Sequence, residues 1–187
     1  YKSGQRAVEL VKQLLAFSRK TRVELKPLDL NGIVREVHQL ARETIDRRID
    51  IDVCLTDETV SVLADAAQMH SVLMNLCVNA RDAITPIMHG SDRLEDSERQ
   101  FLITLETDVI TVDSEYCNAH AYARPGRFAV LVVADTGEGM NSETQRHIFE
   151  PFFTTKEVGA GTGLGLASVY GIVKQHNGWI NVYSERG

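Results

Sequence analysis

The sequence predicts an α/β (α+β) domain in which amphipathic helices and strands share one core. Residues 30–45 and 66–88 place apolar side chains every three to four positions, which is the spacing of amphipathic helices. Residues 49–55 alternate apolar and polar side chains, as half-buried strands do. Residues 128–133 are apolar without alternation, which predicts a central strand covered on both faces.

The composition is that of a globular protein large enough to bury a core. Apolar residues make up 43% and charged residues 25% of the 187 residues. The net charge of −6 argues against a general nucleic-acid binder, which usually carries a basic surplus. The three cysteines form no pair motif, so we expect reduced thiols in a cytoplasmic protein. The first residues already carry a helical pattern, and we expect a fragment of a longer protein.

The first element is a helix over residues 4–22 with a wide apolar stripe. Such a stripe favours a partner, either a second copy or another helix, although packing on its own domain remains the alternative. Pro27 and the polar residues before it indicate a linker. We therefore divide the chain into residues 1–26 and residues 27–187.

The other elements follow in order from the same patterns. Asp29 or Asn31 can cap the helix over residues 30–45, and Asp65 or Ala66 begins the long helix to Met88. The remaining expected elements are a strand at 60–64, an exposed loop at 89–100, a strand at 101–112, a long hairpin connection at 113–127, a short helix capped by Ser142 and Gln145, a helix from Gly163 to Gln175 closed by Asn177-Gly178, and a last strand from Trp179 to Ser184.

The long helix carries a separate polar stripe of Gln68, Asn75, Asn79 and Asp82. Asn75 and Asn79 are four residues apart, so both carboxamides project from one face. Two asparagines on a solvated face would look the same. Their apolar neighbours favour a functional role, because a buried carboxamide is costly unless it is bonded.

Two glycine clusters follow the predicted central strand. Asp135 leads the first, and we expect a buried carboxylate there that accepts an amino hydrogen from adenine. Gly137 and Gly139 let the backbone approach a flat ring, and Met140 offers a polarizable wall. Calcium loops and ordinary turns share this Asp-x-Gly-x-Gly pattern.

Gly161, Gly163 and Gly165 form the second cluster and open an apolar helix, whose free amides favour phosphate. A mobile linker could look similar. Lys156, after Thr154-Thr155, could reach the terminal phosphate, or it could be a solvated loop lysine. Asn79 offers a neutral oxygen for Mg²⁺, which takes few protein ligands when phosphates supply the others.

The ordered set of motifs resembles the GHKL ATP-binding domain shared by sensor histidine kinases, gyrase, MutL-type repair proteins and a class of heat-shock chaperones. Residues 70–80 resemble the N box, Asp135 to Met140 the G1 box, Ile148 to Lys156 the F box and Gly159 to Leu166 the G2 box. The resemblance implies a two-layer sandwich: a mixed β-sheet covered on one face by helices, with an ATP lid between the F and G2 boxes.

The resemblance also implies site residues. The implied nucleotide contacts are Asn75, Asn79, Asp82, Asp135, Gly137, Gly139, Met140, Phe149, Thr154, Thr155, Lys156, Gly161, Thr162, Gly163, Leu164, Gly165 and Leu166. Asn75 and Lys156 are the expected catalytic residues, Asn79 is the expected metal ligand, and ATP with Mg²⁺ is the expected cofactor. The self-hydrolysing members carry a glutamate where this chain has Asn75, so we expect ATP to be kept for another acceptor.

Residues 14–19 resemble the second helix of the dimerisation and phosphoacceptor hairpin in a nitrogen-regulator-like class of sensor kinases. None of the six histidines is followed by an acidic residue, so we expect the phosphoacceptor histidine outside this chain. The resemblance implies a homodimer and a response-regulator receiver domain as partners. A GHKL-type ATPase that dimerises on nucleotide, or a non-catalytic nucleotide-binding regulator, remains an alternative.

Overall fold

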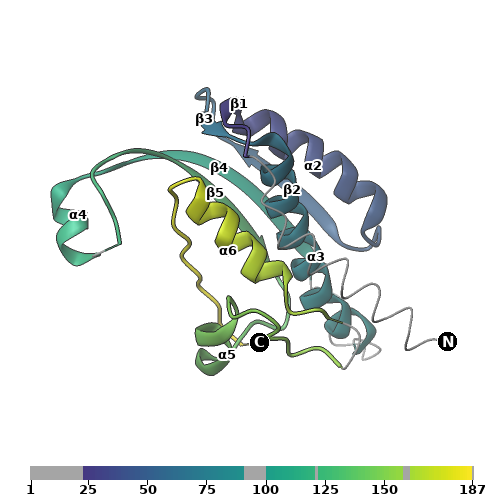
Figure 1. Ribbon diagram of the computed structural model, residues 1–187. Coiled ribbons are helices and arrows are strands. Elements are labelled where there is room, and N and C mark those ends of the chain that lie inside the picture. Colours follow the sequence, from purple (N-terminus) through teal and green to yellow (C-terminus); the bar gives the residue numbers. More distant parts are fainter. Residues whose placement is uncertain (1–22, 91–99, 121, 158–160, 187) are drawn as a thin grey trace.

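The computed structural model describes residues 23–90, 100–120, 122–157 and 161–186 (Figure 1). The helix expected over residues 4–22 lies outside this part, as does most of the loop expected at 89–100. No helix of the described part is long and apolar enough to cross a membrane.

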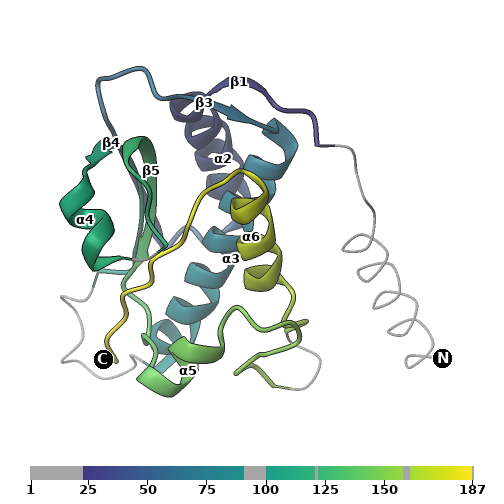
Figure 2. The ribbon, with the colours of Figure 1, turned by 60° about the vertical axis from the view of Figure 1, so that its left-hand side comes forward.

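The fold is a mixed sheet with helices on one face, which confirms the predicted class. Strand β4 (Leu102–Val112) lies between β2 (Asp50–Leu55), which is parallel to it, and β5 (Gly126–Asp135), which is antiparallel. A separate antiparallel pair joins β1 (Lys26–Asp29) to β3 (Ser61–Ala64). Helices α2 (Leu30–Thr44), α3 (Ala66–Gly90) and α6 (Gly165–Gln175) lie on the same side of the sheet (Figure 2). Two short helices, α4 (Ser114–Ala119) and α5 (Ser142–His147), complete the described elements.

The core forms where α2 and α3 pack on the sheet. Leu73 of α3, Val34 of α2 and Leu105 of β4 are completely buried within one apolar cluster. Val169 of α6 joins the same cluster, so the α6 helix is held on α3 by burial of its apolar face. The core therefore fixes the long helix α3 against α6.

The start of α2 matches the expected capping. The Asp29 side chain accepts a hydrogen bond from the Asn31 backbone N–H at 3.1 Å. The buried Asn31 carboxamide donates to the carbonyls of Thr56 and Glu58 and accepts from Thr107 Oγ1 at 2.6 Å. A buried polar group with these partners ties α2 to the end of the sheet at little cost.

The end of α6 also matches expectation. Asn177 adopts φ 58°, the left-handed conformation predicted for this cap. Gly178 N donates to the carbonyl of Val173 at 2.9 Å, and Asn177 N donates to that of Lys174 at 3.0 Å. These two bonds satisfy carbonyls that the helix end would otherwise leave open.

The prediction of a central strand over residues 128–133 is wrong, and so is the strand expected from Trp179 to Ser184. Among the described residues, β5 pairs only with β4, and residues 179–184 form no strand. Trp179 instead packs edge-on against Phe128, with ring centroids 4.6 Å apart. Side-chain contacts of this kind hold the segment beside β5 without a backbone ladder.

The long hairpin connection expected at residues 113–127 is confirmed, since β4 and β5 pair antiparallel up to Val112 and Gly126. It contains helix α4, where Asp113 caps the N-terminus by accepting from Tyr116 N at 2.8 Å. The capping box expected at Ser142 and Gln145 is wrong. Helix α5 is capped by Asn141, which accepts from Thr144 N, and not by Ser142. Gln145 does not reach back to the cap, because its Nε2 donates to the carbonyls of Met140 and Ser184.

Candidate nucleotide-binding site

The polar stripe of α3 faces the start of α6. A Cβ added at Gly165 would lie 3.3 Å from Asn75 Oδ1 and 3.9 Å from Asn79 Nδ2. The Asn75 carboxamide is oriented by its own helix, because Nδ2 donates to the carbonyl of Ser71 at 2.9 Å. Glycine at position 165 thus lets the first turn of α6 approach both asparagines, which are some ninety residues away in the sequence.

Asn79 carries an unsatisfied polar group. Its Nδ2 is buried and has no hydrogen-bond partner among the residues that the structure describes. Such an orphan is costly unless a ligand or solvent satisfies the side chain. Since amide N and O are assigned from their partners, the carboxamide can equally present its oxygen to a cation.

The loop after β5 docks on the same helix. Glu138 N donates to the carbonyl of Ala83 at 3.1 Å, and a Cβ at Gly137 would lie 2.6 Å from the Ala83 Cβ. Gly137 N also donates to Asp135 Oδ1 at 2.9 Å. Only glycine fits between the carboxylate and the helix, so the loop is pinned to α3 at Ala83.

Asp135 is exposed, contrary to the prediction of a buried carboxylate. The reason is that β5 lies at the edge of the described sheet, so the end of this strand meets solvent. Partial desolvation still raises the pKa of Asp135, and the hydrogen bond from Gly137 opposes this shift. The carboxylate is therefore accessible to a ligand and retains a fixed backbone partner.

The second half of this loop closes against the segment after α6. Gly139 has φ +66°, and a Cβ there would lie 1.7 Å from the Glu185 carbonyl oxygen. Met140 N donates to Ser184 Oγ at 2.8 Å. Gly139 is thus required by both its backbone angle and this close approach.

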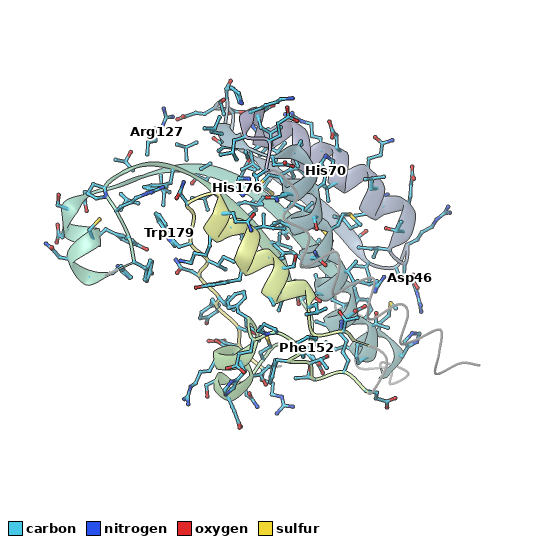
Figure 3. All side chains as sticks on the ribbon, viewed as in Figure 1. Asp46, His70, Arg127, Phe152, His176 and Trp179 are labelled. Atoms are coloured by element: carbon cyan, nitrogen blue, oxygen red, sulfur yellow. The ribbon has the colours of Figure 1, made fainter. Side chains whose placement is uncertain are left out.

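The aromatic segment 149–153 is joined to the second glycine cluster. Phe152 N donates to the Gly163 carbonyl at 2.8 Å, and Gly163 has φ +63°. Phe152, labelled in Figure 3, has φ 71° and is 56% exposed, so its ring does not anchor the contact. A Cβ at Gly161 would lie 2.7 Å from Thr154 Oγ1, which places a second glycine against the same segment.

Lys156 is neither free nor simply solvated. Its Nζ forms an ion pair with Asp82 Oδ2, and Arg81 donates to Asp82 Oδ1 through Nε at 2.8 Å and Nη2 at 2.6 Å. Burial acts to raise the pKa of Asp82, but the hydrogen bonds and charges of Lys156 and Arg81 outweigh it, so the pKa lies below its ordinary value. The carboxylate holds two cations beside α3.

The other residues expected to contact the nucleotide make local contacts or lie in different surroundings. Phe149 stacks obliquely on Tyr170 of α6, with ring centroids 5.4 Å apart. Thr154 and Thr155 are exposed, Leu164 is buried and Leu166 is half-buried. Thr162 Oγ1 accepts from Leu164 N at 3.4 Å, a local contact at the start of the helix.

The four motifs therefore meet along one stretch of α3. Asn75 and Asn79 contact the start of α6, Asp82 holds Lys156, and Ala83 receives the loop after β5. Residues 75–83 make about two and a half helical turns. Sequence reasoning missed Ala83 and Arg81, although a small residue within a polar stripe is a signal of close backbone approach.

Comparison with known proteins agrees with this arrangement. A match to the family "Histidine kinase-, DNA gyrase B-, and HSP90-like ATPase" covers residues 64–187. The sensor kinase CckA of Brucella abortus is 39% identical over 186 residues, 99% of this chain and 18% of that protein. The sensor histidine kinase ZraS of Escherichia coli K12 is 32% identical over 187 residues, 100% of this chain and 34% of that protein. The chain thus spans about a third or less of the length of these curated relatives.

Solved structures of the same kind share the fold. The nucleotide-free catalytic domain of histidine kinase ThkA is 28% identical, with a TM-score of 0.56 over 82% of each chain. Full-length ShkA in complex with AMPPNP is 24% identical, with a TM-score of 0.64 over 92% of this chain and 32% of that one. Since the family match covers more than half of the sequence and the fold agrees, the chain belongs to the family of histidine kinase-, DNA gyrase B- and HSP90-like ATPases, as its motifs predicted.

Proposed function

We propose that this chain is the catalytic ATP-binding part of a two-component sensor histidine kinase. In this proposal it binds Mg-ATP and transfers the γ-phosphoryl group to a histidine outside the chain. The observation that supports it most is that three separate segments, the loop after β5, the Lys156 segment and the start of α6, converge on residues 75–83 of α3. The named relatives, which are sensor kinases, favour the same reaction.

Recognition of the base would fall to the loop after β5. The exposed carboxylate of Asp135 is the acceptor for the adenine amino group, with its other oxygen held by Gly137 N. A guanine, which lacks that amino hydrogen at the same position, would be disfavoured. Gly139 and Met140 continue the loop, which is held by the hydrogen bond from Met140 N to Ser184 Oγ.

Recognition of the phosphates would fall to the start of α6. Residues Gly163 to Leu166 present backbone amides at the N-terminal end of an 11-residue helix, whose dipole favours anions. The Phe152–Gly163 hydrogen bond sets the path of this loop. Lys156 supplies a positive charge for the terminal phosphate. These groups compensate the charge that develops during phosphoryl transfer.

The residues present fit a magnesium ion. Asn79 offers a carboxamide with a buried atom that the described protein leaves unpaired. No group of three or more His, Cys, Asp or Glu in the described residues could hold a metal by itself, and phosphate oxygens and water would supply the other ligands of an ion held by Asn79. Asn79 is therefore the proposed protein ligand of Mg²⁺, which when bound would neutralise charge on the phosphates.

Asn75 favours transfer of the γ-phosphoryl group over hydrolysis of ATP. An amide cannot act as a general base, and its Nδ2 is occupied by the Ser71 carbonyl. Water beside the γ-phosphate is thus not activated at this position, and ATP persists until an acceptor nucleophile arrives. The finer partners remain part of the proposal: a phosphoacceptor histidine on a dimerisation hairpin, a homodimer, a response-regulator receiver domain, and a cytoplasmic location where ATP is available.

Self-labelling tests this function. A protein extended upstream to include a candidate phosphoacceptor hairpin is incubated with Mg²⁺ and γ-labelled ATP, and the protein-bound phosphate is tested for stability. We expect label that is lost in acid and kept in alkali, as phosphohistidine is, and that is absent in Asn79→Ala. Rapid release of free phosphate without protein label would instead favour the ATPase reading.

A further inference from the structure

The ion pair between Lys156 and Asp82 joins two residues that both belong to the proposed phosphate region. Lys156 lies in the segment before the glycine loop, and Asp82 lies 74 positions earlier on α3. Both side chains are mostly buried, with 33% of Lys156 and 24% of Asp82 exposed. The two residues therefore form a specific tertiary contact, and a solvated surface lysine would not show it.

We propose that Asp82 is a positioning residue that holds Lys156 against α3 and competes with the ATP phosphates for it. The inference rests on the proposed function, because it assigns the ligand that displaces the carboxylate. An ammonium group carries one charge, and the triphosphate brings several negative charges to the same place. Binding of ATP would then exchange one anionic partner of Lys156 for another.

The two oxygens of Asp82 make this exchange possible. Oδ1 accepts both hydrogen bonds from Arg81, and Oδ2 accepts from Lys156. When Lys156 leaves, Arg81 still pairs with the carboxylate through two bonds at 2.8 Å and 2.6 Å. Asp82 is therefore not left as an isolated charge in a partly buried place, which would otherwise oppose the exchange.

The aliphatic part of the Lys156 side chain lies against the glycine loop. A Cβ added at Gly161 would lie 3.1 Å from Lys156 Cδ and 3.3 Å from its Cβ. The lysine stem thus packs directly over the backbone of Gly161. The lysine therefore links Asp82 on α3 to the backbone at Gly161, and a shift of its stem on exchange of partners would be felt at this glycine.

A double-mutant cycle on the 187-residue chain tests the inference. ATP and adenosine affinities are measured by titration at fixed Mg²⁺ for wild type, Asp82→Asn, Lys156→Met and the double variant. We expect Asp82→Asn to tighten ATP binding roughly two- to fivefold, since a partly exposed ion pair no longer has to be broken. In the Lys156→Met background, the gain in ATP affinity caused by Asp82→Asn should be smaller by a factor of at least about two. Adenosine affinity should not change.

Controls separate the possible failures. Asp52→Asn removes the same charge from an exposed position on β2 and should leave ATP affinity unchanged. Asp82→Glu keeps the charge and should restore affinity close to that of wild type, while unfolding midpoints confirm that each variant is folded. Equal tightening in both backgrounds, or weaker ATP binding in Asp82→Asn, would overturn the inference. If wild type itself binds no ATP, the proposed function fails first.

Discussion

Gly163→Ala is the most severe single test of the glycine loop. Gly163 has φ +63°, where a residue with a side chain pays roughly 1–2 kcal/mol. The new methyl would lie 2.3 Å from Phe152 C and 2.6 Å from Phe152 Cα. These are backbone atoms, so no side-chain rotation relieves the contact.

The clash must also break the hydrogen bond from Phe152 N to the Gly163 carbonyl, which contributes about 1 kcal/mol. Together these effects disfavour the observed loop by at least about 2–3 kcal/mol. If the loop must adopt this conformation to hold phosphates, ATP affinity falls by the same factor as its population, at least about tenfold. Adenosine, which has no phosphate, should bind as before.

The assay is calorimetric titration of ATP and adenosine, with denaturant unfolding to follow stability. Gly171→Ala is the matched control, because a Cβ there meets no atom within 4 Å and the position is inside α6. That substitution should leave ATP binding intact and stabilise the protein by roughly 0.5–1 kcal/mol. Wild-type ATP affinity in a folded Gly163→Ala variant would refute the role given to this loop.

Three other predictions follow from single residues. Asp135→Asn should weaken ATP binding at least about tenfold, since the adenine amino group loses its carboxylate acceptor; unchanged affinity by titration would remove Asp135 from the site. Asn75→Glu should raise ADP release by the chain, measured by chromatography, because a carboxylate then stands where water can be activated; no gain would mean that Asn75 is not the discriminating position. Asp65 accepts from Glu24 N and Gln68 N, and both bonds lower the pKa of its carboxyl group, the bond from Glu24 most strongly. Its stabilising effect is therefore full above the unfolded value of about 3.9 and is lost as pH falls through the folded pKa. The stability difference between wild type and Asp65→Asn, from denaturant unfolding, should accordingly shrink below about pH 4; a pH-independent difference would contradict the assignment.

The elements near the core could be read from the sequence because burial leaves a periodic pattern. Helix α3 was expected from Asp65 or Ala66 to Met88 and runs from Ala66 to Gly90. The asparagines on its polar stripe are singled out by their spacing and their apolar neighbours, and the structure places both beside Gly165. Periodicity works here because one helix face is buried against α6 and the sheet.

What the sequence could not show is which partner each segment has. The apolar run over residues 128–133 predicts a covered strand but does not say what covers it. The strand lies at the edge of the described sheet, and Trp179 packs on Phe128. The Lys156–Asp82 pair joins residues 74 apart and leaves no local pattern. Likewise, Asn141 and Ser142 are both good caps, and only the backbone path decides between them.

Residues 75–83 of α3 organise the proposed site for Mg-ATP. The most direct measurement is the ratio of ATP affinities with Mg²⁺ and with the metal chelated, compared between wild type and Asn79→Ala. We expect clearly tighter ATP binding with Mg²⁺ in wild type and a ratio close to one in the Asn79→Ala variant. Equal ratios in the two proteins would show that Asn79 does not bind the metal, and would contradict the proposed arrangement of the site.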